Sequence, residues 1–233
     1  MISQPISHWM KTVKEVFTEE ILAAQGTVAD SFEDESRLII RSVLPWERSV
    51  GPGDRLQAGV ALRLAGPNIA VYPYIFRRVC TNGAILAHVL GSQQVLYVET
   101  LITSEIDTMV RVAVRACCQA ELFAEATEQI RAGKNVAADP ALSMMPHLAR
   151  LPRNIVNTVL DSVLIDWMQS TDHSRFGLMN AITARARDTA DPEARWQLEE
   201  LGGRVGVPSL SRLPSPLSGE VEIERTEGLV HTA

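Results

Sequence analysis

Seven arginines between residues 37 and 97 form the densest group of side chains in this 233-residue chain that could bind a charged partner. The same stretch holds two carboxylates and has an excess of five positive charges, whereas the whole chain has a formal net charge of −6. Guanidinium groups bind phosphates, and aromatic rings among them can stack on bases, as in sequence-tolerant single-strand binders. The residues expected to form such a surface are Arg37, Arg41, Arg55, Arg63, Tyr72, Tyr74 and Arg78.

The same residues support a second interpretation. Aromatic residues in a strand lie more often on its buried face, and the arginines would then only solvate the opposite face. The negative net charge of the chain favours this alternative, a protein-interaction or structural module without nucleic-acid binding. The two hypotheses differ in where the arginines lie. One continuous groove would favour nucleic acid, and scattered arginines would favour the interaction module.

A compact motif follows the aromatic residues and reads Arg77-Arg78-Val79-Cys80-Thr81-Asn82-Gly83. Its thiol gives a third hypothesis, a cysteine-dependent enzyme, because nearby cations such as Arg77 favour a thiolate and His88 could act as a base. Cysteine is also among the most buried residue types, so a packing role is the simpler interpretation and we assign no catalytic residue. Asn82-Gly83 predicts a turn, because both residues tolerate a positive φ.

Other residue types with known chemistry are too scattered to predict a site. The five histidines lack Cys-x-x-Cys and His-Glu-x-x-His spacing, so we expect no metal. Gly51-Pro52-Gly53-Asp54 lacks the Gly-Lys-Ser/Thr end of a phosphate-binding loop, and we expect no cofactor. The three cysteines form no disulfide framework, and no run of 18 apolar residues occurs. The sequence therefore predicts a soluble, cytoplasmic protein that does not contact a membrane.

The arginines and aromatics lie in segments whose hydrophobicity alternates with a period of two. Residues 54–64 alternate most clearly, and residues 37–47 and 69–80 continue the pattern, which predicts three antiparallel strands. We expect Pro45 to end the first strand and Pro73 to mark an edge or a bulge, because proline donates no backbone hydrogen bond. Residues 94–101 could add a strand. The acidic, glycine-containing segment 26–36 is typical of a solvated loop.

Helical periodicity surrounds this sheet region. It predicts an N-terminal helix at residues 7–24, one long helix from Ser104 to about residue 131, and further helices at 153–169 and 176–187, with a last one that stops at Gly202-Gly203. The tail, residues 208–233, is rich in Pro, Ser and Glu, which predicts disorder. We expect one α+β domain over residues 1–207. Its sheet region, residues 37–100, would hold at least three antiparallel strands packed on one face by the helical region, residues 104–205.

The motif also carries a resemblance to a known family. The stretch from Phe76 to Gly83, with the later Phe-Gly-Leu-Met-Asn-Ala-Ile-Thr ending at Thr183, resembles the phage/plasmid-like proteins grouped as a domain of unknown function. The match covers roughly residues 37–90 and 175–205, and it implies an association with mobile elements but no activity. The strand and helix layout is similar to that of Rad52-like single-strand annealing proteins. Asn180 and Thr183 lie three apart on one predicted helix face, where a structural hydrogen bond is the default role.

These observations rank the functions. The leading hypothesis is a non-enzymatic, nucleic-acid-associated protein of phage/plasmid type that binds or anneals single-stranded DNA, acting as a homo-oligomer. The alternative is the protein-interaction or structural module, and the cysteine-dependent enzyme comes third.

Overall fold

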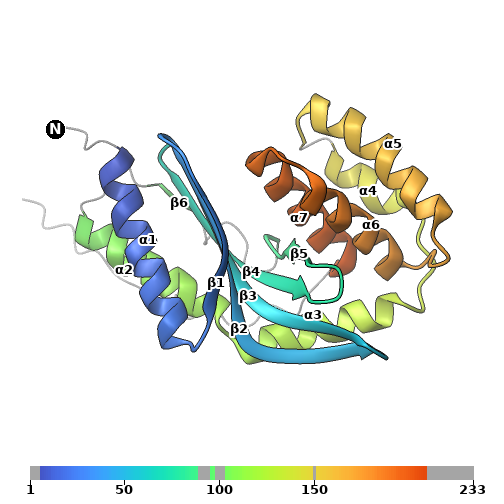
Figure 1. Ribbon diagram of the computed structural model, residues 1–233, viewed down its shortest axis with the longest axis horizontal. Coiled ribbons are helices and arrows are strands. Elements are labelled where there is room, and N and C mark those ends of the chain that lie inside the picture. Colours follow the sequence, from blue (N-terminus) through green and yellow to red (C-terminus); the bar gives the residue numbers. More distant parts are fainter. Residues whose placement is uncertain (1–5, 89–94, 98–102, 149–150, 209–233) are drawn as a thin grey trace, which may run out of the picture.

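The computed structural model describes residues 6–88, 95–97, 103–148 and 151–208. Within these ranges it confirms an α+β fold with an antiparallel sheet (Figure 1). The strands are β1 (Thr27–Glu33), β2 (Arg37–Gly51), β3 (Asp54–Ala65), β4 (Asn68–Arg77), β5 (Asn82–Ile85) and β6 (Val95–Tyr97). The helices are α1 (Ile6–Ala23), α2 (Thr103–Cys117), α3 (Ala120–Gly133), α4 (Pro140–Leu148), α5 (Arg153–Gln169), α6 (Arg175–Asp188) and α7 (Pro192–Gly206). The predicted disorder of residues 209–233 lies outside the described residues.

The sheet has the order β1-β2-β3-β4-β5, and β6 pairs with the first residues of β4. In this register Leu62 of β3 lies between Ile40 of β2 and Val71 of β4. These three side chains and their neighbours at every second position form one buried apolar face. Helices α1 and α2 pack on this face, and the buried side of α1 carries Val13 and Phe17 (Figure 1). The alternation in the sequence therefore identified the core face.

The opposite face of the sheet is also covered, although the sequence predicted helices on one face. Helix α7 lies against it, and α6 packs on α7 (Figure 1). The side chains between α7 and the sheet include Trp196 from the helix and Ile39, Ala61 and Tyr72 from the strands. Small and aromatic residues on this face leave room for a helix, so the face expected to be open is closed over much of its area.

The acidic segment before β2 is a strand rather than the expected loop. Strand β1 pairs with β2 from Thr27↔Val43 to Glu33↔Leu38, with a register shift between Val28 and Asp30. Most of its side chains are exposed, and a hydrophilic composition is normal for an edge strand. Because β1 lies at the edge of the sheet and has no buried face, its residues are hydrophilic, and its composition resembles that of a loop.

Pro45 does not end its strand as predicted, whereas Pro73 lies at a local edge as predicted. Strand β2 continues past Pro45 to Gly51, and the pairing with β3 shifts register between Val43 and Glu47 to accommodate the proline. Pro73 lies in β4 between the residues that pair with β6 and those that pair with β5. At this position β4 is locally an edge strand, so the missing N–H leaves no partner unsatisfied.

Two helix boundaries also differ. The long helix predicted from Ser104 to about residue 131 is broken at Gln119, whose backbone is extended (φ −113°, ψ 120°). The break lets α2 pack against α1 and lets α3 pack against β2 and α6. Helix α7 continues through Gly202 and Gly203, where the sequence predicted its end. Gly203 is needed for close packing, because a Cβ there would lie 2.0 Å from the Ile85 carbonyl oxygen.

Among the described helices, none is long and apolar enough to cross a bilayer.

Candidate functional site

Arg41, expected to face nucleic acid, is buried in an ion-pair network between the sheet and α7. Its side chain is 2% exposed, and its Nε donates at 2.6 Å to Oε2 of Glu199, which is 1% exposed. Asp30 Oδ2 lies 3.3 Å from Arg41 and 2.8 Å from Arg195, which also donates to Glu199. Burial raises the pKa of the Glu199 carboxyl, and the two guanidiniums oppose that rise. The expectation for Arg41 is wrong, because α7 supplies carboxylates where phosphate was expected.

Arg63 and Arg37 are half-buried and also have carboxylate partners. Arg63 Nε donates to Oε2 of Glu193, on α7, at 2.8 Å. Arg37 donates to Asp34 Oδ2 from Nε at 2.8 Å and from Nη2 at 2.6 Å. The hydrogen bonds from Arg37 lower the pKa of the Asp34 carboxyl to about 2. The arginine-to-acid pairs of this face are spread from the β1–β2 turn to α7, so the arginines do not line one groove.

The expectation that Tyr72 and Tyr74 stack on bases is also wrong, since both are buried. The Tyr72 ring lies against Trp196 of α7, with 6.2 Å between ring centroids. Burial raises the pKa of Tyr72 to about 12 and raises that of Tyr74 further. Their rings belong to the core between the sheet and α7 and are not accessible to a nucleic acid.

Two of the predicted arginines, Arg55 and Arg78, remain exposed on the same face, at the end of the sheet near the β2–β3 turn. Both reach one carboxylate, that of Glu47, at 3.5 Å and 2.6 Å. Phe76 is half-buried on this face, with its ring centroid 6.5 Å from that of Tyr74. We call Arg55, Phe76 and Arg78 the open end of the sheet. This open end retains two of the predicted arginines beside one aromatic ring.

The motif residue Arg77 connects the end of β4 to Asp54 and to α6. Its Nε and Nη2 donate to Asp54 Oδ1 and Oδ2 at 2.8 and 3.0 Å, and its guanidinium lies 5.2 Å from the Phe176 ring centroid. Its Nη1 lies 3.3 Å from Cys80 Sγ. Among the described residues, no histidine or carboxylate is hydrogen-bonded to Cys80. His88 is bonded to the Val207 carbonyl instead, and burial lowers the pKa of its imidazole.

The motif and the later Asn-Ala-Ile-Thr segment meet in the structure. Asn82 is buried, and its Nδ2 donates to Thr183 Oγ1 at 2.7 Å across 101 positions of sequence. Asn180, one turn earlier on α6, has a buried Oδ1 without a hydrogen-bond partner among the described residues. The default structural role is therefore observed for Thr183, which also donates to the Met179 carbonyl at 3.0 Å.

The predicted turn is displaced by a few residues from Asn82-Gly83. Both residues belong to β5, and the positive φ of 50° is at Thr81. Gly83 is constrained by space, because a Cβ there would lie 2.0 Å from the Tyr74 hydroxyl oxygen. The residues of the motif therefore pack β4, β5 and α6 against one another.

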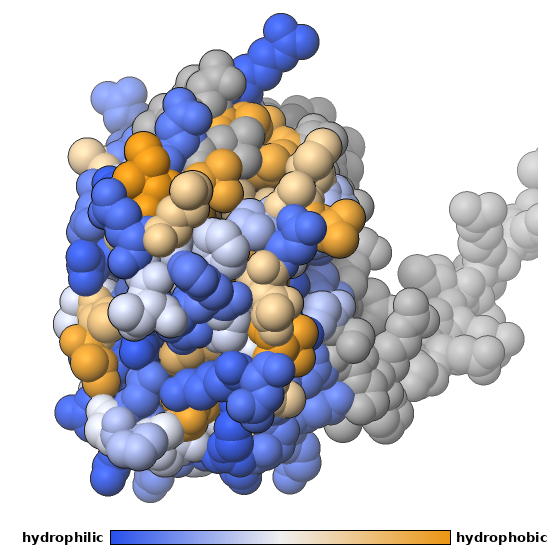
Figure 2. All heavy atoms as spheres, turned by 90° about the vertical axis from the view of Figure 1, so that its right-hand side faces the viewer, coloured by the Kyte–Doolittle hydropathy of each residue, from blue (hydrophilic) through white to orange (hydrophobic). Residues whose placement is uncertain are grey.

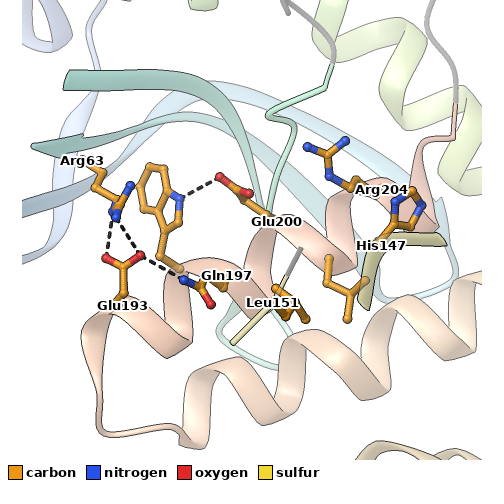
Figure 3. A pocket seen from close by; sticks show the side chains of 9 residues that line it. Arg63, His147, Leu151, Glu193, Gln197, Glu200 and Arg204 are labelled. Carbon is orange, nitrogen blue, oxygen red and sulfur yellow. Dashed lines mark hydrogen bonds and ion pairs between the residues drawn. The ribbon is translucent and has the colours of Figure 1, made fainter. Parts of the chain in front are cut away.

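Sequence reasoning missed a pocket on the outer side of the α7–sheet contact (Figure 3). Its volume is about 190 Å³, and its polar groups come from strand β3, from α7 and from the end of α4. Trp196 Nε1 donates to Glu200 Oε1 at 2.8 Å, and burial raises the pKa of that carboxyl. The lining residues are Arg63, His147, Leu151, Glu193, Trp196, Gln197, Glu200, Leu201 and Arg204. Their spacing along α7 was the available signal, since Glu193, Gln197, Glu200 and Arg204 recur at steps of three and four.

The second missed feature is an apolar surface on α4 and α5. Leu142 and Met145 of α4 are 77% and 65% exposed, and Ile165 and Met168 of α5 are 52% and 70% exposed. Hydrogen bonds between residues 136–138 and 173–175 join the segment before α4 to the segment between α5 and α6. Figure 2 shows apolar side chains gathered in the upper part of this side of the molecule, above a mainly hydrophilic lower part. We call these four side chains the α4–α5 surface.

Comparison with protein-family models, with curated proteins and with solved structures finds no match to this chain. The function must therefore be argued from the sites themselves. In the described part of the chain, no group of three or more His, Cys, Asp or Glu side chains is arranged to hold a metal ion.

Proposed function

We propose that this protein is a non-enzymatic interaction module that self-associates through the α4–α5 surface. The observation that carries the proposal is that α4 and α5 each present two large apolar side chains that are more than half exposed. Single exposed apolar residues are common on protein surfaces, but contiguous apolar patches mark interaction sites. Burying them between two copies would favour association, since each Å² of apolar area removed from water contributes about 25 cal/mol before the entropic cost of association is subtracted.

The position of α5 supports this role. It packs mainly on α6, and Ile165 and Met168 of α5 are exposed. The distribution of arginines points the same way. Arg37, Arg41 and Arg63 are each paired with a carboxylate and do not form the groove that nucleic-acid binding on this face would need.

Light scattering tests the proposal. At about 100 μM, a hundredfold above a Kd of about 1 μM, we expect the wild-type protein to have a multiple of the 25.6 kDa chain mass. The double variant Leu142→Glu with Met168→Glu should be a monomer, because each change places a charge in the apolar contact. Leu22→Glu on α1, which alters an equally exposed apolar residue elsewhere, is the matched control and should associate as the wild type does. A monomeric wild type at this concentration would refute the proposal.

A second candidate function is single-stranded nucleic-acid binding at the open end of the sheet. The observation that favours it is that two exposed arginines share one carboxylate beside a half-buried phenylalanine, which leaves one positive charge in excess. Annealing of complementary strands and a role in a phage or plasmid, which the sequence resemblances imply, belong to this second proposal.

A titration with labelled single-stranded DNA at two salt concentrations tests this candidate. Arg55→Gln with Arg78→Gln should weaken binding and reduce the salt slope by about 0.7 for each phosphate that the variant no longer neutralises. The control, Lys11→Gln with Arg153→Gln, removes two exposed charges from α1 and α5 and should leave the slope unchanged. Binding with an unaltered slope in the first variant would place any nucleic-acid site elsewhere.

A further inference from the structure

The pocket beside α7 shares no lining residue with the α4–α5 surface or with the open end of the sheet. Its volume of about 190 Å³ is below the roughly 300–1,000 Å³ of sites for drug-sized ligands. A ligand held inside it must therefore be small.

Several polar groups of the pocket already have partners. Arg63 and Glu193 form an ion pair, with Arg63 Nη2 and Glu193 Oε1 2.8 Å apart. Gln197 Nε2 donates to the same Glu193 oxygen at 3.2 Å, which fixes the orientation of its amide. Trp196 Nε1 occupies one oxygen of Glu200. These contacts form one end of the pocket and leave no net charge at the Arg63 side (Figure 3).

Three polar groups remain for a ligand. No hydrogen bond or ion pair joins Arg204 to another residue in the part of the chain that the structure describes. Glu200 Oε2 is likewise without a hydrogen bond there, and Gln197 Oε1 is buried without a partner. A buried polar atom without a partner, such as Gln197 Oε1, is costly and calls for an explanation, such as a bound molecule. The pocket thus offers one cation and two acceptors.

The spacing of these groups defines the ligand. Glu200 and Arg204 are four residues apart on α7, a rise of about 6 Å on one side of the helix, and Gln197 lies about one turn before Glu200. A Glu and an Arg at this spacing can pair directly, yet here the two side chains point into the pocket without a contact between them (Figure 3). Opposite charges one helical turn apart in the lining of the same small pocket match a molecule that carries both charges.

We propose that this pocket binds a small zwitterion of the α-amino-acid class, with its carboxylate on Arg204 and its ammonium group on Glu200 and Gln197 Oε1. One amino acid could make a charge-assisted hydrogen bond, about 2.8 Å long, to each of these two groups. Leu151 and Leu201 in the lining leave an apolar wall for a small side chain. Arg63 is already neutralised by Glu193 and takes no part.

Calorimetric titration of the full chain with three matched probes tests this proposal. Alanine carries both charges, propionate lacks the ammonium group and ethylamine lacks the carboxylate. We expect alanine to bind about tenfold or more tightly than either of the other two, because each of them lacks one of the charge-assisted hydrogen bonds. Alanine should also raise the melting temperature, since a ligand that binds only the folded state stabilises it.

Variants locate the site. Arg204→Gln and Glu200→Gln should each weaken alanine binding about tenfold or more, and Glu200→Gln keeps an oxygen for Trp196 Nε1. Arg48→Gln, a change of the same charge at an exposed arginine of β2, is the control and should bind as the wild type does. Equal binding of alanine and propionate would overturn the proposal in favour of a simple anion site. Absent binding of alanine, or unchanged binding by Arg204→Gln, would also overturn it. The probe comparison uses wild-type protein, so it decides even if a variant fails to fold.

Discussion

Removing the Glu199 carboxylate should strongly destabilise the fold, because it leaves the buried Arg41 guanidinium with a single weak partner. Breaking one side of a buried ion pair costs about 3–5 kcal/mol. Asp30 remains 3.3 Å from Arg41 and is partly exposed, which places Glu199→Leu near the lower end, at about 3 kcal/mol. For a chain of this size the melting temperature should fall by about 6–12 °C.

The double variant separates the charge from the packing. Arg41→Met with Glu199→Leu removes both charges and keeps the volume, and such replacements are often neutral, so we expect a stability within about 1 kcal/mol of the wild type. Thermal and urea unfolding of the wild type, the two single variants and the double variant measure the coupling between the residues. A cost below about 1 kcal/mol for Glu199→Leu would show that water reaches Arg41 and that α7 does not seal this face.

Three further outcomes test the packing and the burial around the motif. Gly83→Ala should lower the free energy of unfolding by about 1–3 kcal/mol, since its Cβ would lie 2.0 Å from the Tyr74 hydroxyl; an unchanged urea midpoint would contradict this. Thr183→Val should cost about 1–3 kcal/mol, because it leaves the buried Asn82 amide without its acceptor, and a neutral result would show that water replaces it. Burial raises the pKa of Tyr72 from about 10 to about 12, so the folded state favours the protonated phenol. The contribution of this phenol to the free energy of unfolding is therefore complete below pH 10 and is lost as the pH rises toward 12. In an absorbance titration, Tyr72→Phe should remove a phenol that ionises near pH 12, and loss of one that ionises near pH 10 would refute the burial.

The sequence predicted those features that local patterns determine. The alternation from Leu56 to Leu64 identified a strand and its buried face, because side chains of a strand alternate between faces whatever the rest of the chain does. Helices α5 and α6 were predicted nearly to the residue by their apolar spacing. Strand β1 was missed because an exposed edge strand has no apolar periodicity, and the helix break at Gln119 has no glycine or proline to mark it.

The candidate site depended on contacts that no local pattern encodes. Arginines and tyrosines on one strand face indicate an open basic groove only if nothing covers that face. Glu193 and Glu199 of α7 cover it, and no signal near Arg41 or Arg63 shows that these partners exist. A hint was present in α7 itself, whose acidic residues share a side with Trp196. The apolar composition of α4 was a similar hint for the α4–α5 surface.

The contact between Arg41 and Glu199 also has a consequence for synthesis of the chain. The two residues are 158 positions apart, so a ribosome that adds about 5–20 residues per second makes Arg41 roughly 10–30 s before its partner. During that interval the nascent sheet has no α7, and a strand face with arginines and tyrosines is open to solvent and to other macromolecules. A chain that stops before Pro192 would keep this face uncovered. Such a fragment should bind polyanions and chaperones at this face more strongly than the finished protein does.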